Sequence, residues 1–77
     1  MEIILNNSQL KAFTRLNQRN IKVGSYNTHK DVFIPDVNEI QNQISKNIRL
    51  GNLFFADEIV KDCQTLLIPV LEQGVKI

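Results

Sequence analysis

Residues 52–74, NLFFADEIVKDCQTLLIPVLEQG, form the most apolar stretch of this chain. When successive residues are placed 100° apart, eight of its apolar side chains fall into one arc of about 140°, as in a helix that faces a protein core. These residues are Ala56, Ile59, Val60, Cys63, Leu66, Leu67, Val70 and Leu71. Because the chain has only 77 residues and no other stretch is as apolar, we expect the rest of it to pack on this helix.

The predicted helix has an interruption near its end and two apolar residues outside its arc. Pro69 lacks the N–H that would bond to the Thr65 carbonyl, so we expect a kink or a break near Ile68. Gly74 suits the position that follows the last helical residue. Phe54 and Ile68 project at about 160° and 120° on the same wheel, so either the sheet or another subunit covers them. We predict that these two residues form a protein interface.

A second helix precedes this one and pairs with it. Asp36 and Glu39 have the spacing of a capping box, which places the helix start at residue 37. Its apolar stripe spans about 80°, a width suited to packing on a single partner helix. The stripe consists of Val37, Ile40, Ile44 and Ile48. Gly51 can end this helix and Asn52 can cap the next, so we predict an antiparallel helical hairpin with a turn of about one or two residues.

The N-terminal region predicts a short strand followed by a helix. Residues 2–5, EIIL, are short and rich in β-branched side chains, which is typical of a strand. Asn6 and Gln9 form a capping box for a helix over residues 7–19, and Leu5 and Leu10 have the spacing of a hydrophobic staple. The expected inner face of this helix comprises Leu10, Phe13 and Leu16, with Ala12 at its margin.

Two further β-prone runs, residues 21–23 and 32–34, flank a polar segment that contains Gly and Asn. This pattern predicts a hairpin with a long loop over residues 24–31. Pro35 has no N–H to donate to a ladder, so it ends the second strand. The predicted element order over residues 1–77 is β-α-β-β-α-α. We therefore predict an α+β fold, a small single domain with a short antiparallel sheet packed on a C-terminal helical hairpin.

Charge is distributed unevenly along the chain. Residues 1–30 contain five basic and one acidic side chain, and residues 31–77 contain four basic and seven acidic ones. Such an asymmetry hints at a charged partner or at self-association. Lys11, Arg15 and Arg19 are spaced i, i+4, i+8 and form one stripe on the first helix, although like charges at this spacing repel one another.

This basic stripe is the best candidate for a charged contact. Together with neighbouring residues it can face the phosphates of a nucleic acid or an acidic protein surface. The predicted contact residues are Lys11, Arg15, Arg19, Lys22, Tyr26 and Lys30. Only Tyr26 among them is aromatic, so a platform that stacks single-stranded bases is not indicated.

Nothing in the sequence forms a catalytic or metal-binding motif. Cys63 lies on the apolar arc, where we expect a buried and inert thiol, and His29 is a lone histidine in the predicted loop. One Cys and one His cannot fill a structural zinc site. Asp57, Glu58 and Asp62 are expected as solvated carboxylates on the polar face of the last helix. We predict no catalytic residue, metal ligand or cofactor, and no small-molecule substrate.

The expected setting is the cytoplasm. No window reaches the ~18 apolar residues of a membrane span, so no membrane partner is expected, and the first residues lack the features of a signal peptide. The sequence favours a small non-enzymatic interaction or regulatory protein that binds another protein, self-association included. The alternative is a nucleic-acid-binding module that uses the basic stripe of the first helix.

Overall fold

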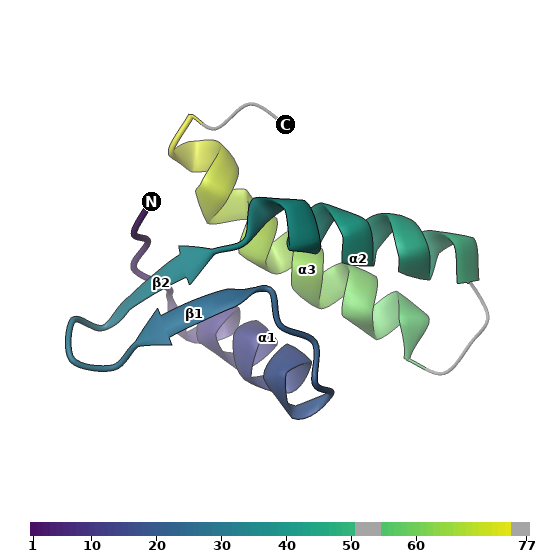
Figure 1. The fold of residues 1–77 in the computed structure, drawn as a ribbon, viewed down its shortest axis with the longest axis horizontal. Helices are drawn as coiled ribbons and strands as arrows, with labels where there is room; N and C mark the ends of the chain where they lie inside the picture. The colour runs from purple at the N-terminus through teal and green to yellow at the C-terminus, as the bar shows by residue number, and fades with distance from the viewer. Residues whose placement is uncertain (51–54, 75–77) are drawn as a thin grey trace.

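Helix α3 (Ala56–Glu72) contacts both other helices, α1 (Asn7–Gln18) and α2 (Val37–Leu50). The computed structural model describes residues 1–50 and 55–74. In Figure 1, α2 and α3 run in opposite directions and form the predicted helical hairpin, while α1 lies on the other side of α3.

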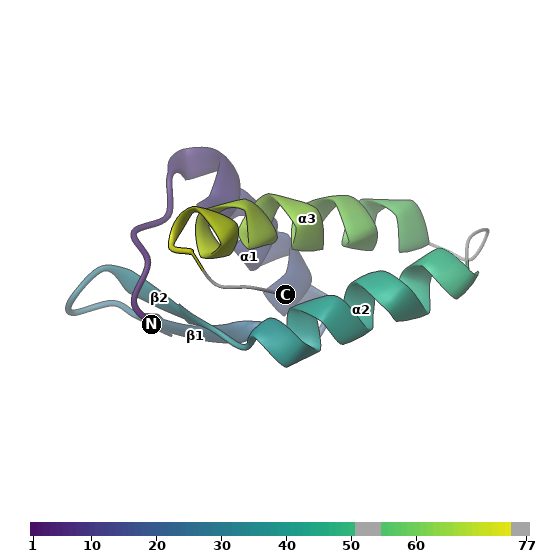
Figure 2. The same cartoon turned by 90° about the horizontal axis from the view of Figure 1, so that it is seen from above.

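The remaining regular structure is an antiparallel hairpin of β1 (Gly24–Asn27) and β2 (Val32–Pro35). Figures 1 and 2 show the hairpin and α2 in one layer and α1 and α3 in the other. The element order of the described chain is α-β-β-α-α. The predicted class, a small α+β domain with a C-terminal helical hairpin, is confirmed.

The buried side of α3 follows the predicted arc, except at one edge. Ala56, Cys63, Leu66 and Val70 are at most 1% exposed. Leu71, which was predicted to face the core, is 50% exposed. It lies at the margin of the arc, and neither flanking helix covers that margin.

The start of α3 differs from the prediction. The helix begins at Ala56, and Phe55 occupies the N-cap position in the left-handed conformation, with φ of 62°. A left-handed residue cannot belong to a right-handed helix, so Phe55 sets the boundary. Since α2 ends at Leu50, the connection is longer than the predicted turn. The predicted cap residues 51 and 52, and the predicted interface residue Phe54, lie outside the described residues.

The end of α3 tolerates its proline. The helix continues through Pro69 to Glu72, so the break predicted near Ile68 is absent. Pro69 lies in the last turn, so its missing N–H removes only the bond to the Thr65 carbonyl, and the helix continues for three more residues. Gly74 follows the helix with a φ of 85°, and its N–H donates to the Leu71 carbonyl at 2.9 Å.

The second strand of the hairpin lies where it was predicted, but the first strand is displaced along the sequence. Residues 24–27, predicted as loop, form β1, and only residues 28–31 connect the strands. The Asn27 side-chain oxygen accepts hydrogen bonds from the His29 and Lys30 N–H groups, which closes a short turn directly after β1. Val23 lies before the strand, is fully buried, and accepts the Asp36 N–H at its carbonyl.

The first predicted strand is reduced to one bridge. Ile3 exchanges both backbone hydrogen bonds with Phe33, at 2.8 and 2.7 Å, but residues 2–5 form no further ladder with β2. In this antiparallel register Pro35 would lie opposite Met1, and it has no N–H with which to extend the pairing toward the N-terminus. At the other end of the segment Asn6 already caps α1, which turns the chain away from the sheet.

The predicted caps formed for α1 and in part for α2. Asn6 accepts from the Gln9 N–H at 2.9 Å, and the Gln9 side chain accepts the Asn6 N–H at 3.0 Å. At α2, the Asp36 carboxylate accepts the Glu39 N–H at 3.1 Å. The reciprocal bond is missing because the Asp36 N–H donates to the Val23 carbonyl, while the Glu39 carboxylate accepts from Gln43.

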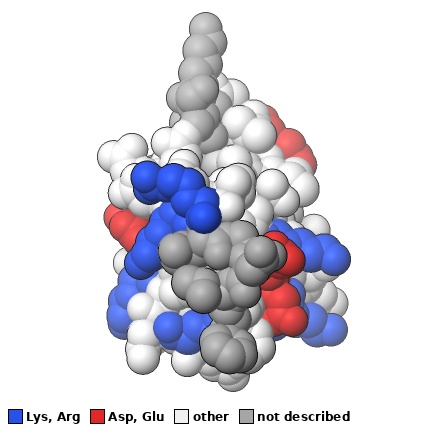
Figure 3. All heavy atoms as spheres, turned by 90° about the vertical axis from the view of Figure 1, so that its right-hand side faces the viewer, with Lys and Arg blue, Asp and Glu red and all other residues white. Residues whose placement is uncertain are grey.

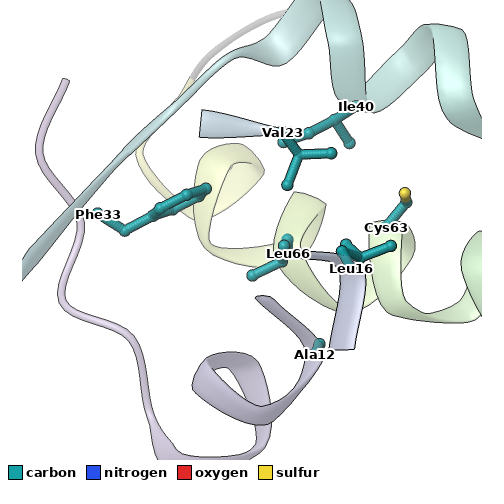
Figure 4. Packing of buried hydrophobic residues seen from close by; sticks show 7 residues of the cluster. All are labelled: Ala12, Leu16, Val23, Phe33, Ile40, Cys63 and Leu66. Atoms are coloured by element: carbon teal, nitrogen blue, oxygen red, sulfur yellow. The ribbon is translucent and has the colours of Figure 1, made fainter. Parts of the chain in front are cut away.

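The core draws side chains from both layers (Figure 4). Phe33 is its largest fully buried side chain, and its ring lies 5.1 Å from that of Phe13 between centroids. Ala12, predicted at the margin of α1, is fully buried in this cluster, because the face that α1 turns to α3 is centred nearer Ala12 than expected. The cluster consists of Ala12, Leu16, Val23, Phe33, Ile40, Cys63 and Leu66.

The hairpin provides a test of its close packing at Gly24. A Cβ atom at this position would lie 2.4 Å from the Ile34 carbonyl oxygen and 2.7 Å from the Phe33 ring. We expect Gly24→Ala to lower the free energy of unfolding by about 1–3 kcal/mol, measured by urea denaturation. Ser25→Ala, at the neighbouring exposed position, should change it by less than about 0.5 kcal/mol. Equal effects of the two substitutions would refute this packing.

Candidate interaction surfaces

The basic stripe of α1 faces α3 rather than solvent alone. Arg15 donates two hydrogen bonds to the Asp62 carboxylate, from Nε at 3.0 Å and from a terminal nitrogen at 2.7 Å. The Asp62 side chain is 7% exposed, whereas that of Arg15 is 51% exposed. The hydrogen bond to Asp62 raises the pKa of Arg15, which stays cationic. This fork-shaped pair therefore joins the two helices through a buried carboxylate.

Arg19 makes a second link between the same helices, one turn further along. Its guanidinium donates to the Glu58 carboxylate at 2.8 Å. It also lies 4.0 Å from the centroid of the Phe55 ring, within the range of a cation–π contact. Glu58 is largely exposed, so this link is more open to water than the one at Asp62.

These two links correct the expectation for the acidic residues. Asp62, predicted as a solvated carboxylate, is buried and paired, while Asp57 and Glu58 are exposed. The sequence did contain a signal for this pairing, because Glu58 and Asp62 share the four-residue spacing of Arg15 and Arg19. When two basic residues on one helix and two acidic residues on another have the same spacing, both pairs can form ion pairs as the helices pack side by side. Part of the charge asymmetry of the chain is thus satisfied inside the fold.

The remaining predicted contact residues do not gather on one surface. Lys11, Lys22 and Lys30 are exposed, but Lys30 lies in the hairpin loop, which Figure 1 shows at the far end of the molecule from the end of α1. The Tyr26 hydroxyl donates to the Asp31 carboxylate, and this bond raises the pKa of Tyr26. The ring of Tyr26 packs beside Phe13, at 6.1 Å between centroids.

A space-filling view shows mixed charge where the ends of these helices meet solvent. On the side drawn in Figure 3, Lys and Arg side chains lie on both flanks, with Asp and Glu side chains among them. Such an arrangement is not a continuous basic field. The six residues predicted for a charged contact remain a prediction, with two of them already engaged by α3.

An apolar area lies on α3 instead. Ile68 is 52% exposed and Leu71 is 50% exposed, and their three-residue spacing puts them on the same side of the helix. We call this side, with the exposed residues Asp57, Lys61 and Gln64, the outer face of α3. Ile68 was predicted as an interface residue. Leu71 was not predicted as an interface residue. Its position at the edge of the apolar arc nearest to Ile68 could have indicated its exposure.

Three findings concern other classes of function. In residues 1–50 and 55–74, no helix is long and apolar enough to cross a membrane. Within the same ranges, no three His, Cys, Asp or Glu side chains are grouped so that they could hold a metal ion. Comparisons of the chain with protein-family models, with curated proteins and with solved structures found no match.

The two links between α1 and α3 differ in burial, which a pair of double-mutant cycles can test. We expect Asp62→Ala to cost about 1–3 kcal/mol of unfolding free energy, because a charged hydrogen-bond acceptor is lost. Arg15→Ala should cost more, since it leaves the buried Asp62 carboxylate unpaired. The coupling of Arg19 with Glu58 should stay below about 1 kcal/mol. Equal coupling in the two cycles, measured by urea denaturation, would contradict this ranking.

Cys63 makes a prediction for alkaline pH. Burial of the thiol, followed by the charges of Asp62 and Glu39, raises its pKa from 9.0 to about 12. Between these values the unfolded state binds fewer protons than the folded state, so stability falls as pH rises, by up to about 1.4 kcal/mol per pH unit. Cys63→Ala removes the contribution of the thiol to this pH dependence.

The pH effect is read from the difference between the two proteins. Urea denaturation at about pH 7 and about pH 10 should show a smaller loss of stability for Cys63→Ala than for the wild type. Other titrating groups are present in both proteins and cancel. If both proteins lose the same stability, the thiol is not shielded in the folded state.

Proposed function

We propose that this chain is a small non-enzymatic interaction protein that binds another protein, self-association included, through the outer face of α3. The observation that carries the proposal is the half-exposure of Ile68 and Leu71 side by side. Neither α1, α2 nor the hairpin covers them within the described chain. Adjacent apolar side chains left in water favour association, because a partner that covers them releases their hydration water.

The composition of the outer face supports a protein partner. Its apolar pair is bordered by Gln64 and Lys61, which can form a polar rim around a small apolar centre. The setting in this proposal is the cytoplasm, which suits a chain that keeps Cys63 as a buried free thiol.

The nucleic-acid alternative draws less support. Arg15 and Arg19 already donate to carboxylates of α3, and a phosphate would have to compete with Asp62 and Glu58 for them. The other basic residues of the predicted set lie apart from one another. No further observation in the described chain favours this alternative.

A photo-crosslinking amino acid at position 68 tests the proposal in cells that naturally carry the protein. We expect one discrete adduct, identified by mass spectrometry, and none from the same probe at Asn42, which is exposed on α2. The captured protein is then purified and titrated. Ile68→Ser and Leu71→Ser should each weaken binding by at least about fivefold without unfolding the chain.

Ile34→Ser is the matched control, because Ile34 is 42% exposed but lies on β2, in the layer that does not contain α3. It should leave the affinity unchanged. The proposal fails if position 68 yields no adduct, or if Ile34→Ser weakens binding as much as Ile68→Ser does.

A further inference from the structure

The outer face of α3 carries a regular pattern of its own. Asp57, Lys61, Gln64, Ile68 and Leu71 follow one another at alternating steps of four and three residues, and all are exposed. This spacing aligns side chains along one seam, as at the contact positions of a two-helix coiled coil. The seam is polar toward the start of α3 and apolar toward its end. In an antiparallel pair of such seams the apolar end of one helix meets the polar end of the other, whereas in a parallel pair like ends meet.

We propose that the outer face of α3 binds the same face of a second copy of this chain, with the two α3 helices antiparallel. This inference rests on the proposed function and names the partner for that face. A two-fold axis relates the copies, so the contact is closed and uses the same surface twice. In the register centred between Gln64 and Ile68, Ile68 of one copy faces Gln64 of the other, and Leu71 faces Lys61.

The polar members of the seam can cover the apolar ones. Lys61 has a four-carbon stem that can lie along Leu71 of the second copy while its ammonium group stays in water. Gln64 covers Ile68 in the same way with its shorter stem. The half-exposed Ile68 and Leu71 of both copies thereby lose contact with water, which is the favourable term for association.

Charge selects the antiparallel direction. Glu72 is exposed next to Leu71, so in this register each Lys61 lies beside Glu72 of the second copy, at both ends of the contact. A parallel pair would instead place Lys61 beside Lys61 and Glu72 beside Glu72. Neither side chain takes part in an ion pair within the described residues, so both are available for this contact.

The arrangement of the helices leaves room for the second copy. On α3, the buried residues Asp62 and Leu66 lie on the side opposite the seam. In Figure 2, α2 and the hairpin lie on one side of α3, and α1 passes behind it. A second α3 can thus approach this helix without displacing α1 or α2.

Sedimentation equilibrium of the purified chain tests the inference. We expect the apparent mass to rise from 8.9 kDa toward twice that value as the concentration increases from about 10 to 500 µM. Ile68→Ser should weaken the dimer by at least about fivefold. A wild-type chain that stays monomeric over this range overturns the inference.

Charge reversal tests the direction of the pair. Lys61→Glu and Glu72→Lys should each weaken self-association about five- to tenfold, and an equimolar mixture of the two variants should restore it as a heterodimer. Lys30→Glu makes the same charge change in the loop between β1 and β2, in the other layer of the fold, and should have no effect. Failure of the mixture to recover, or equal weakening by Lys30→Glu, overturns the antiparallel register.

The outcome for the proposed function is read separately. A wild-type chain that is monomeric, but whose position-68 probe captures a different protein, overturns the second copy as partner and leaves the proposed function standing. A chain that neither dimerises nor yields an adduct overturns both. Far-UV circular dichroism of every variant confirms that the exposed substitutions have left the helices intact.

Discussion

Helix α3 packs against α1 and α2 at the same time, and the rest of the fold depends on this constraint. Cys63 and Leu66 lie on the side that the core closes over, while Asp62 lies on the flank toward α1. A carboxylate can occupy that flank only because Arg15 reaches it from α1, since an unpaired buried charge is costly. With α1 and α2 packed on two flanks, no helix of the described residues covers the third side of α3. The exposure of Ile68 and Leu71 follows from this arrangement.

Part of the charge of this chain acts between its own helices. Basic residues are in excess near the start of the chain and acidic residues near its end. In the sequence, this asymmetry suggested binding to a charged partner. In the fold, α1 and α3 lie together, and two cations of α1 pair with two carboxylates of α3. The repulsion between Arg15 and Arg19 is thereby offset, because each of them lies at hydrogen-bond distance from a carboxylate of α3. Lys61 and Glu72, on the outer side of α3, have no such internal partners in the described chain.

The small sheet is defined by local devices at its ends. The Asn27 side chain closes the turn, Gly24 admits the Phe33 ring, and Pro35 stops the ladder. Ile3 adds one bridge and buries its side chain, but the chain then turns into α1. A strand of this length contributes little alone, so the hairpin depends on the helices that cover its inner face.

By itself, the sequence determined the features that depend on near neighbours along the chain. The caps of α1 and α2, the apolar arc of α3 and the burial of Cys63 could all be predicted, because capping and helical periodicity involve residues three or four positions apart. Only the tertiary structure decided which faces meet. The pairing of Arg15 with Asp62 spans 47 positions, β1 formed from residues with weak strand preference, and Leu71 was left exposed. Periodicity defines a face but not its neighbour, so these outcomes required the packed fold.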